Sequence, residues 1–290
     1  MYSITKLDDK ITRYEIRDEK SGNYFRVAPE RGGIVTDFSV GQKDVLWMDW
    51  DTFYDTSRYV WGGIPVLFPN CGMLENNTAV FNGRDYTLPL HGIARNFPWA
   101  VRETYMDALY GTITLGFSSN GKTREQFPFD FTYDIKYTLT DNLLDIKLFI
   151  KNISAADMPV HFGFHPYFTV TGKGEKLVYD TPCTRYMEAP WGIEKPFRDF
   201  PVLTEDRNGK FLLDTKGKFG FTDPDRGMSV YIKSEISLPL FLLWAGEGEK
   251  FCIEPWSAGV NTLNTGKGLI WIRPGMMFES GFSIKAEARR

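Results

Sequence analysis

The chain has 290 residues, with 42% apolar and 24% charged residues, as in ordinary globular proteins. Its net charge of −3, without a block of basic residues, excludes a nucleic-acid footprint. The most apolar stretch, residues 236–245, is too short to cross a membrane as a helix, which takes about 20 residues.

Length and cysteine content set two further expectations. We predict one domain spanning residues 1–290, with two domains as the alternative. Cys71, Cys183 and Cys252 are few, odd in number and far apart, which disfavours a disulfide framework and a zinc knuckle. They suit a reducing compartment, and the first residues lack the apolar segment of a signal peptide, so we expect a cytoplasmic protein.

Strand patterns follow one another along the first half of the chain. Short helical turns are expected at most in a few loops, such as residues 56–61. Asn82-Gly83 lies between two short apolar runs and predicts a two-residue hairpin turn. Residues 112–117 alternate, and in residues 129–140 every odd position is apolar and every even one polar. A turn at Asp141-Asn142 and renewed alternation to Ile150 then predict a β-hairpin.

The second half of the chain shows the same two-residue alternation of apolar and polar positions. Residues 230–233 alternate, residues 240–244 lead to a predicted turn at 246–249, and a further strand follows at 251–253. Phe278, Phe282 and Ile284 share one face of a last predicted strand. No long window has helical spacing free of Gly or Pro, so we predict an all-β fold, a large antiparallel β-sandwich.

Histidine is the residue type that titrates nearest neutral pH, and the chain has only His91, His161 and His165. If residues 161–165 form a strand, His161 and His165 share one face and the intervening phenylalanines point the other way. Gly163 and Pro166 argue against the helix on which a His-x-x-x-His metal site works best, so we expect no metal. The alternative role for this pair is that of buried, hydrogen-bonded core histidines.

Glu254 is a carboxylate near a predicted strand end, followed by Pro255 and Trp256. It suits a ligand groove, whereas a solvated glutamate at a strand end is the simpler alternative. No second acid accompanies it at a recognisable spacing, so a two-carboxylate glycosidase lacks support. The segment 61–72 lacks the Gly-Lys-Ser/Thr of a phosphate-binding loop.

Four segments in one order, residues 63–70, 90–96 with Trp99, 163–168 and 253–256, resemble the aldose 1-epimerase (galactose mutarotase-like) family. The resemblance implies a β-supersandwich with a monosaccharide in an open groove. It also implies an isomerase that interconverts the α and β anomers of a hexose without a metal or organic cofactor.

Matched residue by residue, the resemblance makes His165 the general acid and Glu254 the general base. Their ordinary pKa values, about 6.5 and 4.3, suit these roles at neutral pH. His91 and Arg95 match residues near the sugar hydroxyls and the ring oxygen, and Asn70 is a further substrate-binding candidate. Trp256 or Trp61 is expected either to pack on the apolar face of the sugar or to belong to the core.

The chain departs from the family pattern at Met73, where many relatives carry an Arg that contacts the sugar or its phosphate. A substrate-binding Asp has no evident match, and His161 is unexpected. Two alternatives therefore remain open: a sugar-binding protein without catalysis, and a mutarotase acting on a hexose 6-phosphate. The second requires a basic cluster, for which Arg95, Arg84 and Arg124 are candidates. The oligomeric state, monomer or homodimer, is open.

Overall fold

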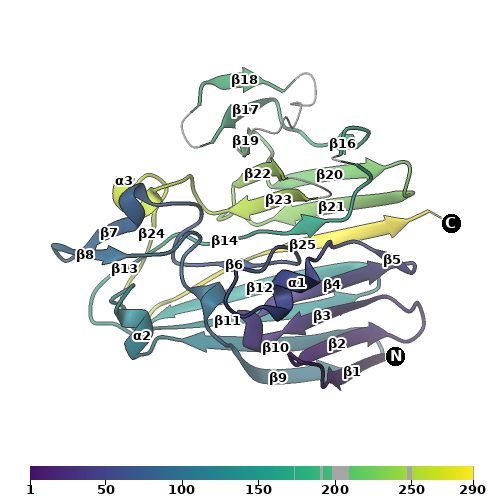
Figure 1. The fold of residues 1–290 in the computed structure, drawn as a ribbon, viewed down its shortest axis with the longest axis horizontal. Helices are drawn as coiled ribbons and strands as arrows, with labels where there is room; N and C mark the ends of the chain where they lie inside the picture. The colour runs from purple at the N-terminus through teal and green to yellow at the C-terminus, as the bar shows by residue number, and fades with distance from the viewer. Residues whose placement is uncertain (173, 190–191, 198–208, 247–249, 290) are drawn as a thin grey trace.

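The computed structural model describes residues 1–172, 174–189, 192–197, 209–246 and 250–289. Within these residues, antiparallel strands form three large sheets and two small ribbons, which confirms the all-β expectation (Figure 1). No helix in this described part is long and apolar enough to cross a membrane.

The N-terminal sheet has the strand order β1-β2-β3-β4-β5. Its strands are β1 (Tyr2–Leu7), β2 (Arg13–Asp18), β3 (Tyr24–Ala28), β4 (Ile34–Val40) and β5 (Lys43–Asp44). Its inner face buries Ile16 and Phe25, and the ring of Phe25 lies 6.3 Å from that of Tyr137 in the central sheet. The Tyr137 hydroxyl donates a hydrogen bond to the Gly33 carbonyl at 2.8 Å, so the two sheets are joined by polar as well as apolar contacts.

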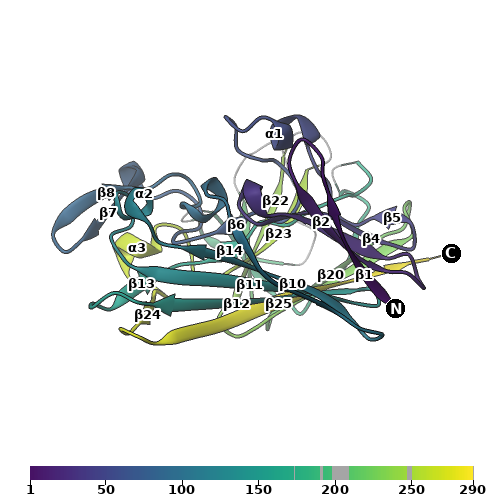
Figure 2. The same cartoon turned by 90° about the horizontal axis from the view of Figure 1, so that it is seen from below.

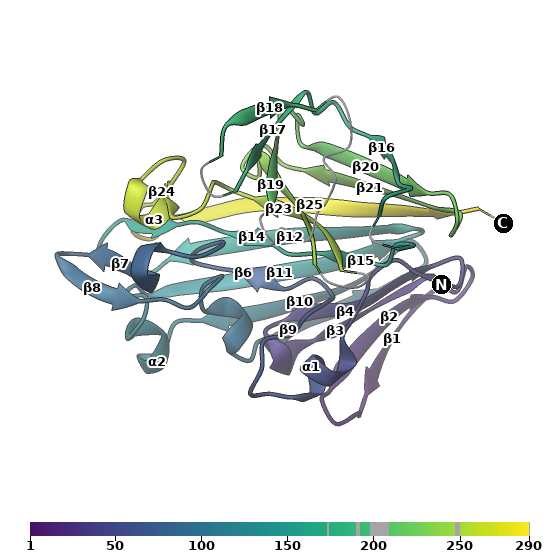
Figure 3. The same ribbon diagram turned by 45° about the horizontal axis from the view of Figure 1, so that its top comes forward.

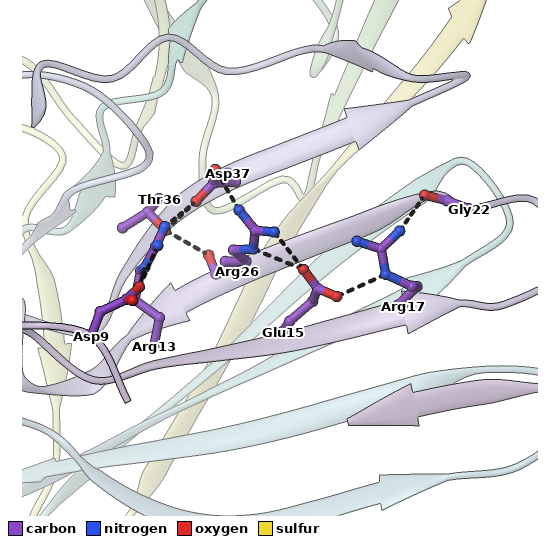
Figure 4. Close-up of polar contacts among 8 residues, drawn as sticks. All are labelled: Asp9, Arg13, Glu15, Arg17, Gly22, Arg26, Thr36 and Asp37. Atoms are coloured by element: carbon purple, nitrogen blue, oxygen red, sulfur yellow. Dashed lines mark hydrogen bonds and ion pairs between the residues drawn. The ribbon is translucent and has the colours of Figure 1, made fainter. Parts of the chain in front are cut away.

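The opposite face of this sheet carries a chain of alternating charges (Figure 4). Arg13 binds Asp9 at 2.6 Å and Asp37 at 3.1 Å. Arg26 binds Glu15 at 2.7 Å and approaches Asp37 at 3.5 Å. Several of these side chains are shielded by their neighbours, so this network tolerates salt better than isolated surface pairs do.

The central sheet has the order β16-β20-β21-β25-β12-β11-β10-β9. Its strands are β16 (Val178–Asp180), β20 (Lys218–Asp223), β21 (Met228–Ser234), β25 (Met277–Ala288), β12 (Leu143–Asn152), β11 (Phe131–Thr140), β10 (Gly111–Ser118) and β9 (Ala100–Met106). The predicted hairpin is confirmed: β11 pairs with β12 from Phe131↔Asn152 to Thr140↔Leu143. Every second residue of β11 is buried, as the alternation predicts.

The third sheet carries the groove described below and has the order β18-β17-β19-β22-β23-β14-β6. Its strands are β18 (Glu194–Pro196), β17 (Arg185–Glu188), β19 (Lys210–Leu213), β22 (Leu240–Ala245), β23 (Phe251–Trp256), β14 (Gly163–Phe164) and β6 (Val66–Leu67), with β15 (Tyr167–Phe168) also paired to β23.

The third sheet packs on the central one through aromatic rings. The ring centroids of Phe164 and Phe282 lie 4.8 Å apart, and those of Phe68 and Tyr133 lie 5.2 Å apart. Seen from below, β6 and β14 lie over the layer formed by β10–β12 and β25 (Figure 2). The turned view of Figure 3 shows β17–β19 and β20–β21 on one side of β25 and the N-terminal sheet on the other. The molecule is therefore a sandwich extended at both ends.

The remaining elements are short. The ribbons pair β7 (Thr78–Phe81) with β8 (Arg84–Thr87) and β13 (Met158–Val160) with β24 (Ile270–Ile272). The helices are α1 (Trp50–Tyr54), α2 (Gly121–Arg124) and α3 (Thr262–Thr265), with 3₁₀ turns η1 (Pro29–Arg31), η2 (Glu75–Asn77) and η3 (Ala94–Asn96).

Two of these elements test local predictions. The Asn82-Gly83 turn is confirmed, with both residues at positive φ between β7 and β8. The helical turn expected at residues 56–61 is wrong. The helix lies at residues 50–54, because the Asp49 side chain accepts a hydrogen bond from the Thr52 N–H at 3.0 Å and caps it. Of the predicted turn at 246–249, residues 247–249 lie outside the described part.

Candidate active site

A groove of about 900 Å³ opens on the third sheet. Its wall includes His91, His165, Glu254, Trp61, Trp244 and Trp256. These residues come from segments far apart in the sequence, which β6, β14, β15, β22 and β23 bring together. Three residues that the sequence singled out as catalytic or substrate-binding, His91, His165 and Glu254, therefore share one cavity.

His165 and Glu254 form a direct pair. His165 Nε2 lies 3.3 Å from Glu254 Oε1, and both residues are buried. The backbone N–H of His165 donates to the Pro65 carbonyl at 3.1 Å. Its imidazole stacks on the Tyr167 ring, with centroids 4.5 Å apart and planes at 7°. Backbone and ring contacts thus fix the imidazole opposite the carboxylate.

Trp256 holds the second oxygen of the Glu254 carboxylate. Its indole N–H donates to Glu254 Oε2 at 3.1 Å. Trp256 is 1% exposed and lies edge-on to both His91 and His161. Although Trp256 borders the groove, its ring is almost fully enclosed by neighbouring side chains, which favours the core alternative over a sugar-stacking ring. Glu254 is 1% exposed, so the alternative of a solvated glutamate is wrong.

His91 lies across from this pair, with its ring 5.3 Å from the His165 ring. It adopts a left-handed backbone conformation, with φ of 64°. The His91 Nδ1 accepts a hydrogen bond from the Gly72 N–H at 3.0 Å, and the backbone N–H of His91 donates to the Gly72 carbonyl at 3.1 Å. Because Nδ1 is an acceptor, the proton of the neutral ring sits on Nε2, where it can serve a ligand hydroxyl.

His161 lies behind the groove. Its Nδ1 accepts from the Cys71 N–H at 3.3 Å, and its Nε2 donates to the Ala258 carbonyl at 3.0 Å. Both ring nitrogens are thus satisfied and the side chain is fully buried. Of the two readings given for the His161 and His165 pair, the core role describes His161.

Burial shifts the pKa values of His165 and Glu254 in opposite directions. Loss of solvent, and then the nearby Arg95 charge, lower the pKa of His165 to about 3. Burial raises the pKa of Glu254 well above its ordinary value, with the Trp256 hydrogen bond acting the other way. The expectation of ordinary values at both residues was therefore wrong, because it took no account of desolvation.

Asn70 and Arg95 do not line the groove. Asn70 is fully buried, and its Nδ2 donates to the Gly72 carbonyl at 3.0 Å, which supports the loop beneath His91. Arg95 is near enough to His165 and His91 for its charge to lower the pKa of both. Arg84 and Arg124 lie on β8 and α2, away from the groove, and Arg124 pairs with Asp130 at 2.5 Å.

The groove also has an aromatic wall that the sequence only partly indicated. Trp61 stacks on Trp244, with centroids 6.1 Å apart and planes at 23°. Trp244 in turn lies 6.0 Å from the His165 ring. Trp61 was named as a candidate, whereas Trp244 was read only as part of an alternating strand. Met73 lies on the groove wall and is 62% exposed. Among the described residues, no group of three or more His, Cys, Asp or Glu side chains is arranged to hold a metal ion.

Comparison with known proteins agrees with this fold. A crystal structure of the Slr1438 protein from Synechocystis sp. PCC 6803 is 30% identical, covers 100% of both chains and has a TM-score of 0.91. Galactose 1-epimerase from Lactobacillus acidophilus NCFM shares the fold at 14% identity, with a TM-score of 0.79 over 100% of this chain and 99% of that one.

A curated relative from Salmonella typhimurium, named as a putative glucose-6-phosphate 1-epimerase, is 36% identical over 143 residues. That match covers 48% of this chain and 45% of the relative, so the chain matches less than half of the relative's length. The family model described as Aldose 1-epimerase matches residues 15–285. A sandwich with a histidine and a glutamate paired in one groove, and a family match over nearly its whole length, place this chain in the aldose 1-epimerase family.

Proposed function

We propose that this protein is a hexose mutarotase, built as a single domain, in which His165 and Glu254 exchange protons with the sugar. The contact between His165 Nε2 and Glu254 Oε1 supports the proposal, because an imidazole and a carboxylate lie side by side in an open groove, as a general acid and a general base would need to. Aldose 1-epimerases need no cofactor. In the proposed mechanism, His165 and Glu254 supply the two proton carriers that the reaction requires.

Ring opening breaks the bond between C1 and the ring oxygen. Glu254 takes the proton of the anomeric hydroxyl, C1 becomes an aldehyde, and His165 gives its proton to the ring oxygen. After rotation about the C1–C2 bond, the 5-hydroxyl attacks the other face of the aldehyde, His165 recovers the hydroxyl proton and Glu254 returns its own to O1. Protons and electrons balance, and the pair returns to its starting state.

The pKa shifts strengthen the two groups in their reactive forms, although the same shifts disfavour ionised Glu254 and protonated His165 at neutral pH. Burial makes a glutamate a stronger base and an imidazolium a stronger acid. A positioned acid or base contributes typically 10²–10⁴-fold, which is sufficient for a reaction that already proceeds in water. His91 Nε2–H is proposed to bind a sugar hydroxyl, with Trp61 and Trp244 beside the ring.

The test is polarimetry of freshly dissolved α-D-glucose and α-D-galactose. Glu254→Gln keeps the shape of the side chain and removes its basicity, so we expect kcat to fall by at least about 100-fold. Glu75→Gln, which changes an exposed acid on the same groove wall, is the matched control and should retain activity. A Glu254→Gln protein as fast as the parent would sink the proposal.

A hexose 6-phosphate is the second candidate substrate. It is supported by Arg95, whose guanidinium lies near His165 without a carboxylate partner among the described residues, and by the name of the Salmonella relative. Mutarotation of a panel of free and phosphorylated aldoses decides between the two. The third reading, sugar binding without catalysis, predicts saturable binding in calorimetry with no rate acceleration, and the His165–Glu254 pair counts against it.

A further inference from the structure

One end of the molecule carries an apolar face, the tip face, that no described segment covers. It consists of Ile153, Trp271, Met276 and Met277, and each of these residues is at least 51% exposed. They come from the loop after β12, from β24, from the turn before β25 and from the start of β25. Figure 2 shows β13, β24 and the start of β25 together at this end, away from the N-terminal sheet.

The buried side chain and backbone of Asn152 hold these segments together. The Asn152 N–H donates to the Met276 carbonyl at 3.0 Å, and the Gly275 N–H donates to the Asn152 carbonyl at 2.9 Å. The Asn152 Nδ2 donates to the Ile272 carbonyl at 2.7 Å, and Asn152 itself is fully buried. The loop after β12, the end of β24 and the turn before β25 therefore form one fixed surface.

The composition of the tip face is that of a binding surface. Single exposed apolar side chains are normal in folded proteins and need no partner. Here four of them are neighbours, and they include one tryptophan and two methionines, residue types that are enriched at protein–protein interfaces. Association would remove this apolar surface from water, which favours a bound partner.

Charges of both signs border the tip face. Lys151 and Arg273 are positive, Asp157 and Glu279 are negative, and all four side chains are exposed. None of them makes an ion pair with a described residue. A surface that binds a nucleic acid or an anionic membrane carries an excess of positive charge, which this one lacks. Equal numbers of both signs allow the face to match another copy of itself, because a two-fold dimer brings one patch onto the same patch.

We infer that the tip face is the surface at which a second copy of this chain binds, as a two-fold symmetric dimer. Asp157 and Arg273 come directly before and after the paired residues Met158 and Ile272, so they lie side by side at one end of the β13–β24 ribbon. Across a two-fold axis at this end, Arg273 of each copy faces Asp157 of the other. The apolar side chains fill the centre, and the two symmetric ion pairs fix the orientation.

The tip face is separate from the candidate active site. None of its four residues lines the groove, so dimerisation leaves the groove open and does not depend on the function proposed above. A standard interface takes about 20–30 residues from each partner. Segments 151–157 and 271–279 supply fewer, so we expect a reversible dimer that dissociates at micromolar concentration.

The first test is sedimentation velocity of the full chain over a concentration series from micromolar to hundreds of micromolar. The parent should pass from monomer to dimer, and Trp271→Gln should weaken the dimer at least 10-fold, because it removes the largest apolar side chain of the face. Ile236→Gln is the matched control, since Ile236 is 98% exposed and lies between β21 and β22, outside the tip face. A parent that stays monomeric, or equal weakening by both substitutions, would overturn the inference.

The second test exchanges the charges without disturbing the fold, because both side chains are exposed. Arg273→Glu and Asp157→Arg should each weaken the dimer, since like charges then face each other across the axis. An equimolar mixture of the two variants should dimerise as tightly as the parent, because both pairs are attractive again. A mixture that remains monomeric, or a parent that grows beyond the dimer as the concentration rises, would defeat the two-fold pairing.

Discussion

At the scale of single residues, the candidate site depends on the contacts that hold each polar atom of His165 and Glu254. The Glu254 carboxylate has its two oxygens in different contacts, Oε1 facing His165 and Oε2 accepting from Trp256. His91 and Trp256 are likewise fixed by the Gly72 loop and by aromatic neighbours. Trp256 is therefore best described as a positioning residue for the base.

Trp256→Phe tests this role, because it keeps a large ring and removes only the indole N–H. A hydrogen bond to a charged group contributes about 1.5–3 kcal/mol, so we expect kcat to fall roughly 10-fold with KM little changed. Since this bond lowers the pKa of Glu254, its loss should move the acidic limb of the pH–rate profile to higher pH. Stopped-flow polarimetry across pH measures both effects.

Trp99→Phe is the matched control for that substitution. Trp99 is also buried, but its indole N–H donates to the Ala94 carbonyl at 3.1 Å, away from the groove wall. It should lose stability without a change in the pH profile. The same profile shift in both variants, or none in Trp256→Phe, would contradict the positioning role.

At the scale of elements, β14 holds the site together although it is only two residues long. It pairs with β23 on one side and β6 on the other, so that Gly163 faces both Trp256 and Leu67. A Cβ on Gly163 would lie 2.8 Å from the Pro255 carbonyl oxygen and 2.8 Å from the Trp256 ring. Only glycine allows the strand that precedes His165 to come this close to the strand that carries Glu254.

Gly163→Ala should therefore push β14 and β23 apart. We expect it to lower the free energy of unfolding by about 1–3 kcal/mol, as overpacking does, and to lower kcat because His165 and Glu254 separate. Gly83→Ala is the control: at φ of 72° it strains a turn, by about 1 kcal/mol, but its added Cβ meets nothing within 4 Å. Urea unfolding measures the stability of both variants, and polarimetry measures their activity. Full activity in Gly163→Ala would contradict this explanation.

At the scale of the whole molecule, buried histidines couple folding to pH. Burial lowers the pKa of His161 to about 4 in the folded state, against about 6.5 in an unfolded chain. The unfolded state therefore binds a proton first as the pH falls. The stability linked to His161 is fully present above pH 6.5 and is lost as the pH falls from 6.5 towards 4. The lowered pKa values of His91 and His165 act in the same direction.

His161→Gln removes one titrating group from behind the groove. We expect the drop in the free energy of unfolding between pH 6.5 and 4.5 to shrink by roughly 2 kcal/mol relative to the parent. Urea unfolding at a series of pH values measures it, and an unchanged slope of free energy against urea shows that the denatured state is comparable. The same pH dependence in parent and variant would show that His161 does not titrate as described.

The sequence by itself determined the strand alternation, the hairpin of β11 and β12, the Asn82-Gly83 turn and the family, because these depend on local period, turn chemistry and short motifs. It also named His91, His165 and Glu254, which the structure places in one groove. The helix at residues 50–54 was missed because its cap is a single side-chain contact from Asp49.

Only the tertiary structure decided the rest. Desolvation of His165 and Glu254, the satisfied ring of His161 and the contact between Trp256 and Glu254 all depend on which strands lie side by side. Arg31, Arg58 and Arg95 come from three separate segments of the sequence, yet they line one cavity of the folded chain. Burial and charge proximity are properties of space, and a one-dimensional pattern does not encode them residue by residue.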